Sequence, residues 1–269
     1  MTNTPQEIIK NAGNVGEYKS NLKNNNLLLR SFVGGLLIAI GASLSTVVST
    51  GLEIPGIKQL VAGAVFPVGL IILVLTGMEL FTGNCMILPV ACMQKKIPWI
   101  KAFYVCLWTY TGNFIGALFW AYLMSVGPFS KGGTPELTVF GQNAVSISQT
   151  KVLSYQLAGL SGLWSAFMKG IACNLLVNLA ILLSFTSKEM IGKILGIWFP
   201  IMAFVACGFE HSVANMYFIP AGMFLGSNVT WQQFLFWNMM PVTIGNIIGG
   251  TVFVGLIYHL SFKNEVCSL

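Results

Sequence analysis

The sequence predicts an all-α membrane protein with six transmembrane helices arranged as an inverted repeat of three plus three. The first observation is composition: of 269 residues, 55% are hydrophobic and 8% are charged, and the mean hydropathy is +0.76. A soluble domain is about 25% charged. The second observation is a set of six long apolar stretches, and the third is a motif that occurs once in each half of the chain. These features indicate a fold inside a bilayer with two related halves.

The first thirty residues are hydrophilic and lack the apolar core of a signal peptide. Ile8 and Ile9 are the first large apolar side chains, and we expect a short amphipathic helix that lies on the bilayer surface. The sequence therefore divides into a cytoplasmic N-terminal segment at 1–30, a six-span transmembrane pore domain at 31–262 and a cytoplasmic C-terminal tail at 263–269.

Six apolar spans make up the transmembrane domain, and about 20 residues suffice to cross the hydrocarbon. The second and fifth spans are longer than this and contain glycine and proline interruptions, so we expect both helices to be broken. The spans lie at about Ser31–Gly51, Gln59–Cys92, Ala102–Val126, Gly159–Phe185, Met190–Phe224 and Phe234–Leu260.

The basic residues predict the orientation of the spans. Cytoplasmic loops of membrane proteins carry an excess of Lys and Arg, and a cytoplasmic N-terminus places ten basic residues inside and three outside. Both termini are therefore expected in the cytoplasm, with the protein in the plasma (inner) membrane. The inside residues are Lys10, Lys19, Lys23, Arg30, Lys95, Lys96, Lys101, Lys188, Lys193 and Lys263, and the outside residues are Lys58, Lys131 and Lys151.

The repeat consists of the pattern Gly-x-Glu, four residues, Asn, four residues, Pro, whose two copies lie 131 residues apart. Because three spans per half is an odd number, the second copy enters the membrane upside down relative to the first. Inverted repeats with matching broken helices indicate a transport path at the repeat interface. The matched residues are Gly77, Glu79, Asn84 and Pro89 in the first copy and Gly208, Glu210, Asn215 and Pro220 in the second.

A second match supports the repeat. Gly112-Asn113-Phe-Ile-Gly116 in span three corresponds to Gly245-Asn246-Ile-Ile-Gly249 in span six, 133 residues later. Each Gly-x-x-x-Gly lets a neighbouring helix approach closely. Close packing does not explain the two asparagines, because their amides need polar partners.

Glu210 and His211 stand side by side in an otherwise apolar region. An ionisable group at membrane depth costs roughly 2.5–3.5 kcal/mol or more and by default marks a functional site. The chain has no aspartate, two distant histidines and scattered cysteines, so it offers neither a catalytic pair nor clustered metal ligands. We expect no enzyme activity, no metal and no cofactor.

An aquaporin-type channel for neutral solutes shares the inverted-repeat logic and is the alternative from a different class. It would show paired Asn-Pro-Ala boxes and a selectivity arginine, whereas this chain has only Arg30, outside the predicted spans. A nucleic-acid partner is not expected, because membrane topology explains the net charge of +6.

Four segments resemble the formate/nitrite transporter family, which includes hydrosulfide channels and protist lactate transporters. The resemblance implies an aquaporin-like protomer, a homopentamer and one pore per protomer for small monovalent weak-acid anions. Formate is the first candidate, with nitrite, hydrosulfide, acetate and lactate as alternatives in the same pore. The segments are Gly77-Met-Glu-Leu-Phe-Thr82, Gly170-Ile-Ala-Cys-Asn174-Leu-Leu-Val, Phe204-Val-Ala-Cys-Gly-Phe-Glu-His-Ser-Val-Ala-Asn-Met216 and Pro241-Val-Thr-Ile-Gly-Asn-Ile-Ile-Gly-Gly250.

The resemblance also implies the residues of the pathway. It assigns a Leu-Phe-Thr element and a central histidine to the two helix breaks, and it assigns apolar constrictions on either side. The family's vestibule lysine aligns without gaps to Ala158, which leaves Lys151 and Lys169 as candidates for the vestibule cation. The pathway residues are Leu80, Phe81, Thr82 and His211, with constrictions at Phe66, Leu70, Leu80 and Phe204 and with Asn246 near the histidine.

These residues suggest a mechanism in which the anion is neutralised before it crosses. We expect basic vestibule residues to attract the anion, which gains a proton near His211 and passes the apolar constrictions as the neutral acid. Thr82, Ser212 and Asn246 are expected to donate hydrogen bonds to the substrate. The structural polar residues are expected to be Glu79, Glu210, Asn84, Asn215 and Asn174, with both glutamates accepting hydrogen bonds from the broken backbone of the opposite repeat.

Overall fold

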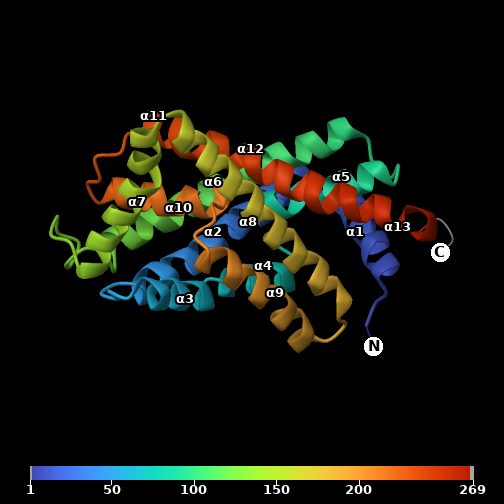
Figure 1. The fold of residues 1–269 in the computed structure, drawn as a ribbon, viewed down its shortest axis with the longest axis horizontal. Helices are drawn as coiled ribbons and strands as arrows, with labels where there is room; N and C mark the ends of the chain where they lie inside the picture. Colours follow the sequence, from blue (N-terminus) through green and yellow to red (C-terminus); the bar gives the residue numbers. More distant parts are fainter. Residues whose placement is uncertain (1, 267–269) are drawn as a thin grey trace.

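The computed structural model describes residues 2–266, and these residues form a bundle of helices (Figure 1). Within this part of the chain, extended pairing is limited to two isolated bridges, Thr2–Ser187 and Ser130–Leu137. The predicted all-helical class is therefore confirmed. The C-terminal tail expected at 263–269 lies partly outside the described residues, because α13 is followed to Val266.

The first half of the chain forms six helices, and the second half forms four helices and one long helical rod. The first half comprises α1 (Pro5–Ser20), α2 (Asn24–Val48), α3 (Pro55–Val65), α4 (Val68–Thr76), α5 (Phe81–Met93) and α6 (Trp99–Val126). The second half comprises α7 (Val139–Ala158), α8 (Leu160–Thr186), α9 (Met190–Ala206) and α10 (Ser212–Phe224). The rod comprises α11 (Trp231–Phe234), the π-helical η1 (Leu235–Met239), α12 (Met240–Ile248), the π-helical η2 (Gly249–Leu256) and α13 (Ile257–Val266).

Among the described residues, five helical segments are long and apolar enough to cross a bilayer. Two shorter apolar helices, α5 and α9, accompany them. The five segments are Asn24–Val48, Pro55–Thr76, Trp99–Val126, Leu160–Thr186 and Trp231–Lys263. The chain thus has the apolar helices of an integral membrane protein.

Two glycines end helices at the positions of the repeated motif. Gly77 follows α4 with φ 72°, and Gly208 follows α9 with φ 69°. Glycine adopts this left-handed conformation without the steric penalty of a Cβ atom. The chain then runs through the extended residues Leu80 and His211 into α5 and α10. Each break therefore places a helix N-terminus inside the bundle.

Close helix crossings hold the bundle together at the second motif. A Cβ on Gly116 of α6 would lie 1.9 Å from the carbonyl oxygen of Phe32 in α2, and one on Gly245 of α12 would lie 2.3 Å from that of Phe167 in α8. Glycine at both positions lets the backbones touch. The α2–α6 and α8–α12 crossings are built in the same way.

The N-terminal helix α1 packs its apolar side chains against protein, whereas we expected them to face lipid. Ile8 and Ile9 are buried, and α1 packs against α5, α8 and α13. The apolar stripe of α1 therefore covers protein and is not available to bind lipid.

Helix α7 has no counterpart among the six predicted spans. It packs against α10 and α8, and it lies near the end of the molecule opposite to α1 (Figure 1). The helices α1 and α7 therefore cap the two ends of the bundle.

Candidate functional site

Asn113 of α6 fastens the first helix break. Its Oδ1 accepts a hydrogen bond from the amide of Phe81 at 2.9 Å, and its Nδ2 donates to the carbonyl oxygens of Ser31 at 2.7 Å and Glu79 at 2.9 Å. Leaving a buried backbone group without a hydrogen-bond partner costs about 1–3 kcal/mol of stability. One amide side chain thus satisfies two backbone groups at the break, those of Phe81 and Glu79, and ties them to Ser31 of α2.

Asn246 of α12 fastens the second break with the same three bonds. Its Oδ1 accepts from the amide of Ser212 at 2.8 Å, and its Nδ2 donates to the carbonyl oxygens of Gly170 at 2.8 Å and Glu210 at 3.0 Å. We expected Asn246 to bind substrate. Because backbone groups occupy both polar atoms of its side chain, it holds the break instead.

The first glutamate lies in a polar group that we call the Glu79 cluster (Glu79, Lys19, Asn84 and Thr109). The carboxylate of Glu79 accepts from Lys19 Nζ at 2.9 Å and from Asn84 Nδ2 at 3.2 Å. Lys19 also donates to Asn84 Oδ1 at 2.8 Å, and Asn84 donates to Thr109 at 3.2 Å. The carboxylate is thus neutralised by a lysine that α1 supplies.

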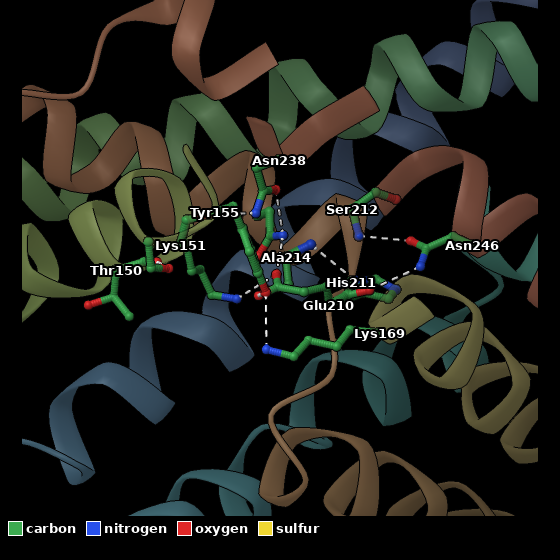
Figure 2. Close-up of polar contacts among 12 residues, drawn as sticks. Thr150, Lys151, Tyr155, Lys169, Glu210, His211, Ser212, Ala214, Asn238 and Asn246 are labelled. Atoms are coloured by element: carbon green, nitrogen blue, oxygen red, sulfur yellow. Dashed lines mark hydrogen bonds and ion pairs between the residues drawn. The ribbon is translucent and has the colours of Figure 1, made fainter. Parts of the chain in front are cut away.

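The second glutamate lies in the Glu210 cluster (Glu210, Lys151, Asn215, Tyr155 and Asn238), which Figure 2 shows. The carboxylate accepts from Lys151 Nζ at 2.8 Å, Asn215 Nδ2 at 2.6 Å and the Tyr155 hydroxyl at 2.9 Å. Asn215 also donates to Asn238 at 2.8 Å. Here α7 supplies the lysine, so the two end helices have matching roles.

The two clusters correct the expected role of the glutamates. We predicted that they accept hydrogen bonds from the backbone of the opposite repeat, but among the described residues their carboxylates are held by side chains. Of the two vestibule candidates, Lys151 reaches Glu210 directly. Lys169 donates to the Tyr155 hydroxyl at 3.3 Å (Figure 2).

The two broken spans meet at Thr82 and His211. The Thr82 hydroxyl lies 2.9 Å from His211 Nε2, and His211 Nδ1 accepts the amide of Ala214 at 3.0 Å. Because Nδ1 is an acceptor, a neutral imidazole carries its proton on Nε2 and donates it to Thr82. Both residues are buried, and the Thr82 hydroxyl keeps its own proton to donate.

Apolar side chains close the space on both sides of this pair. The rings of Phe66 and Phe204 meet edge to face at 5.5 Å, and Phe204 stacks on the His211 ring at 5.7 Å. Leu70 and Leu80 are buried on the other side. Phe66 and Phe204 line a hollow that reaches His211, and Leu70 and Leu80 line a second hollow at the other end of the bundle.

Two hollows open on either side of the constrictions. The α7 vestibule has a volume of about 250 Å³ and the α1 vestibule about 310 Å³. The α7 vestibule is lined by Lys58, Lys151, Phe66, Phe204, His211 and Asn215, among others. The α1 vestibule is lined by Tyr18, Lys19, Arg30, Leu70, Glu79 and Leu80, among others.

Several predicted residues do not line the vestibules, and Phe81, Ser212 and Asn174 are among them. Phe81 packs its ring against Tyr110 at 4.8 Å and borders a separate apolar groove. Ser212 is buried with no hydrogen-bond partner for its hydroxyl among the described atoms. Asn174 donates to the carbonyl oxygens of Thr82 at 3.0 Å and Asn246 at 2.6 Å, so it ties the two breaks together.

Lys19 and Tyr155 belong to the site, but neither was predicted for it. Lys19 lies 132 residues before Lys151, close to the 131-residue offset of the glutamates. Extending the repeat beyond the apolar spans would therefore have paired the two lysines. No comparable sequence signal identifies Tyr155.

The family of the chain follows from comparison with known proteins. Residues 6–260 match the formate/nitrite transporter family. The chain belongs to this family. Members of the family are transporters and channels, not enzymes. A probable formate transporter of Methanothermobacter thermautotrophicus is 42% identical over 97% of this chain and 98% of its own length. The formate channel BtFdhC of Bacillus thuringiensis is 36% identical over 97% of this chain and 96% of its own length.

Solved structures of the formate/nitrite transporter family share the fold. An ion channel of the family superposes with a TM-score of 0.83 at 29% identity, covering 95% of this chain and 98% of that channel. A pentameric formate channel with formate bound superposes with a TM-score of 0.74 at 30% identity, covering 89% and 98%. The predicted family membership is thus confirmed.

Proposed function

We propose that this protein conducts small monovalent anions of weak acids, with formate as the first candidate, and that they cross the centre of the pore as neutral acids. The observation that carries the proposal is the buried Thr82–His211 pair, which lies between two cation-bearing vestibules and beside apolar constrictions. The named formate channels among the relatives and structures support the choice of formate.

The energetics favour a neutral permeant. Moving a bare carboxylate into a dry apolar slit costs tens of kcal/mol in the Born limit. Protonating an acid with a pKa of about 3.7 at pH 7 costs roughly 4–5 kcal/mol, at 1.36 kcal/mol per pH unit. Protonation is therefore cheaper by a wide margin wherever Phe66, Phe204 and Leu80 exclude water.

Thr82 is the proposed donor to the substrate. It accepts from His211 Nε2, so its own hydroxyl proton points elsewhere and is available to an anion oxygen. The substrate's proton comes either from water in a vestibule or from the imidazole. In both routes Arg30 in the α1 vestibule and Lys58 in the α7 vestibule raise the local anion concentration at the two ends of the pore.

The proposed membrane arrangement has six spans in an inverted repeat, with helices two and five broken at Gly77 and Gly208 and with both termini in the cytoplasm of the plasma membrane. The matched bonds of Asn113 and Asn246 support the repeat. A homopentamer with one pore per protomer is proposed by likeness to the pentameric formate channel. In this arrangement α1 covers the cytoplasmic end and α7 the outer end.

The experiment that tests the function is uptake of labelled formate into liposomes that carry the purified protein, with protein-free liposomes as the control. Nitrite, hydrosulfide, acetate and lactate serve as competitors, and glycerol tests the neutral-solute alternative. Formate uptake that the small anions inhibit and glycerol does not affect supports the proposal. Glycerol flux without formate uptake would contradict it and favour an aquaporin-like channel.

A further inference from the structure

Arg30 of α2 and Lys169 of α8 occupy matching positions at the two helix breaks. The carbonyl oxygen of Arg30 accepts the amide of Glu79 at 3.3 Å, and the carbonyl oxygen of Lys169 accepts the amide of Glu210 at 3.3 Å. The next residue in each helix, Ser31 or Gly170, accepts from the asparagine that fastens the break. The fold therefore sets one basic side chain beside each cluster, in addition to the lysine inside it.

A tyrosine holds each of these two cations. Arg30 Nη1 donates to the Tyr18 hydroxyl at 3.1 Å, and the guanidinium lies 5.9 Å from the centre of the Tyr18 ring. Lys169 Nζ donates to the Tyr155 hydroxyl at 3.3 Å and lies 5.3 Å from that ring. Contact with an aromatic face stabilises a cation without neutralising it.

Charge distinguishes these cations from the cluster lysines. Lys19 and Lys151 are each ion-paired with a glutamate. Among the side chains that the structure describes, no carboxylate lies within 4.0 Å of Arg30 or Lys169. The surplus positive charge beside each cluster therefore resides on Arg30 and on Lys169.

We propose that Arg30, held by Tyr18, is a capture site in the α1 vestibule for anions that present two oxygens in one plane. This inference rests on the proposed anion pore and refines its substrate class. A guanidinium has five N–H donors in a planar fork, and Tyr18 engages one nitrogen, so the remaining edge binds a carboxylate or nitrite through two bonds. Lys58, which lines the α7 vestibule, carries a point charge that attracts anions without regard to shape. The two mouths of the pore therefore select anions differently.

The test measures initial uptake of labelled formate from each side separately. Vesicles of the two orientations are separated, and protease access to an N-terminal tag reports the sidedness. Nitrite has two oxygens and hydrosulfide has none, so both are used as competitors on each side. In the wild type, nitrite competes better relative to hydrosulfide from the α1 side than from the α7 side.

Arg30→Lys keeps the charge and removes the fork. It raises KM for formate from the α1 side by about threefold or more, because one of two charge-assisted bonds is lost, and it leaves the maximal rate and the KM from the α7 side unchanged. Arg30→Gln raises KM for hydrosulfide as well. Lys23→Gln, which removes the same charge from the exposed start of α2 outside the vestibule lining, leaves all these values unchanged.

Several outcomes would overturn the inference. The wild type itself decides it even if no variant folds, because an equal ratio of nitrite to hydrosulfide competition on the two sides rules out a shape-selective mouth. A fall in maximal rate without a change in KM for Arg30→Lys would make Arg30 structural. Absence of formate uptake by the wild type would instead contradict the proposed function, and the capture site with it.

Discussion

The Glu79 and Glu210 clusters use the same residue types but differ in how the lysine arrives. Lys151 comes from α7, which runs directly into α8, whereas Lys19 comes from α1, which residues 21–23 join to α2. The lysine side chain is 12% exposed in the first cluster and 20% in the second. An end helix thus completes each cluster, but α7 is joined to α8 by Gly159 alone, whereas three residues join α1 to α2.

A second difference lies at the centre. Offset by 131 residues, His211 corresponds to Leu80, and Thr82 corresponds to Val213. His211 accepts the amide of Ala214 at the start of α10, whereas Leu80 offers no such side-chain bond to α5. The residues that match between the two halves, such as Asn113 and Asn246, hold the backbone at the helix breaks. The residues that differ between the halves, Thr82 and His211, form the central polar pair. The two halves are therefore alike where they stabilise the fold, and they differ where the proposed pore needs polar side chains.

The largest expected effect tests whether the two breaks are equivalent. Asn113→Leu and Asn246→Leu each leave two buried backbone groups of a helix break without partners, at about 1–3 kcal/mol per group. We expect each variant to lose about 4 kcal/mol of stability, measured by the denaturation midpoint in detergent. If one of these variants keeps its stability and the other does not, the two helix breaks are not equivalent.

The next prediction contrasts the glutamates. Breaking a buried ion pair costs roughly 3–5 kcal/mol, so Glu210→Gln should destabilise the whole protein by about 3 kcal/mol. Glu79→Gln should cost less, because α1 can undock and return Lys19 to water. Protease cleavage at residues 21–23 should then rise in Glu79→Gln alone.

The control for the glutamates removes both charges. Lys151→Met combined with Glu210→Gln should recover part of the stability that Glu210→Gln loses, because no unpaired charge stays buried. A stable, well-assembled Glu210→Gln with altered anion preference would contradict the structural role of this carboxylate.

A smaller effect probes the central pair. Thr82→Val removes the hydroxyl that meets His211, and a net hydrogen bond is worth about 1 kcal/mol. We expect formate uptake to slow by about fivefold, the factor that corresponds to this energy, while the denaturation midpoint changes little. Thr82→Ser should keep most of the rate, and equal rates for Val and Ser would exclude the hydroxyl from the pathway.

The smallest effect concerns the cap of α1. Backbone and side-chain hydrogen bonds from Thr4 lower the pKa of Glu7. The folded carboxylate therefore gives up its proton at lower pH than the unfolded one, so its stabilisation is present at neutral pH and is lost as pH falls through the lowered pKa. Acidification should increase proteolytic release of α1 in the wild type. Glu7→Ala should show a raised release of α1 that does not depend on pH. If Glu7→Ala keeps the pH profile of the wild type, the Thr4–Glu7 cap does not stabilise α1.

The sequence predicted the residues that hold the two helix breaks, but it did not predict the roles of the end helices α1 and α7. The repeat identified Glu79, Glu210, Asn113 and Asn246, because identical spacing within apolar spans reports a shared backbone geometry. It did not show which backbone groups the asparagines bond, since those partners come from other helices. The pairing of Lys19 with Glu79 was missed because α1 is hydrophilic and its docking depends on tertiary contacts.

Two side-chain directions also lay beyond the sequence. Phe81 belongs to the Leu-Phe-Thr element, yet its ring turns to Tyr110 because the start of α5 points it towards α6. Arg30 was counted outside the spans, but α2 begins at Asn24 and carries it to the α1 vestibule. Helix boundaries that shift by a few residues thus decide which side chains reach the pore.

The most direct test of the central claim separates the proton gradient from the membrane potential. Labelled formate uptake is measured in proteoliposomes with an imposed pH gradient at zero potential, and then with an imposed potential at equal pH. Crossing as the neutral acid predicts accumulation that follows the pH gradient and ignores the potential, and it predicts that His211→Phe abolishes this uptake. Accumulation that follows the potential, ignores the pH gradient and persists in His211→Phe would contradict the account and make the protein a simple anion channel.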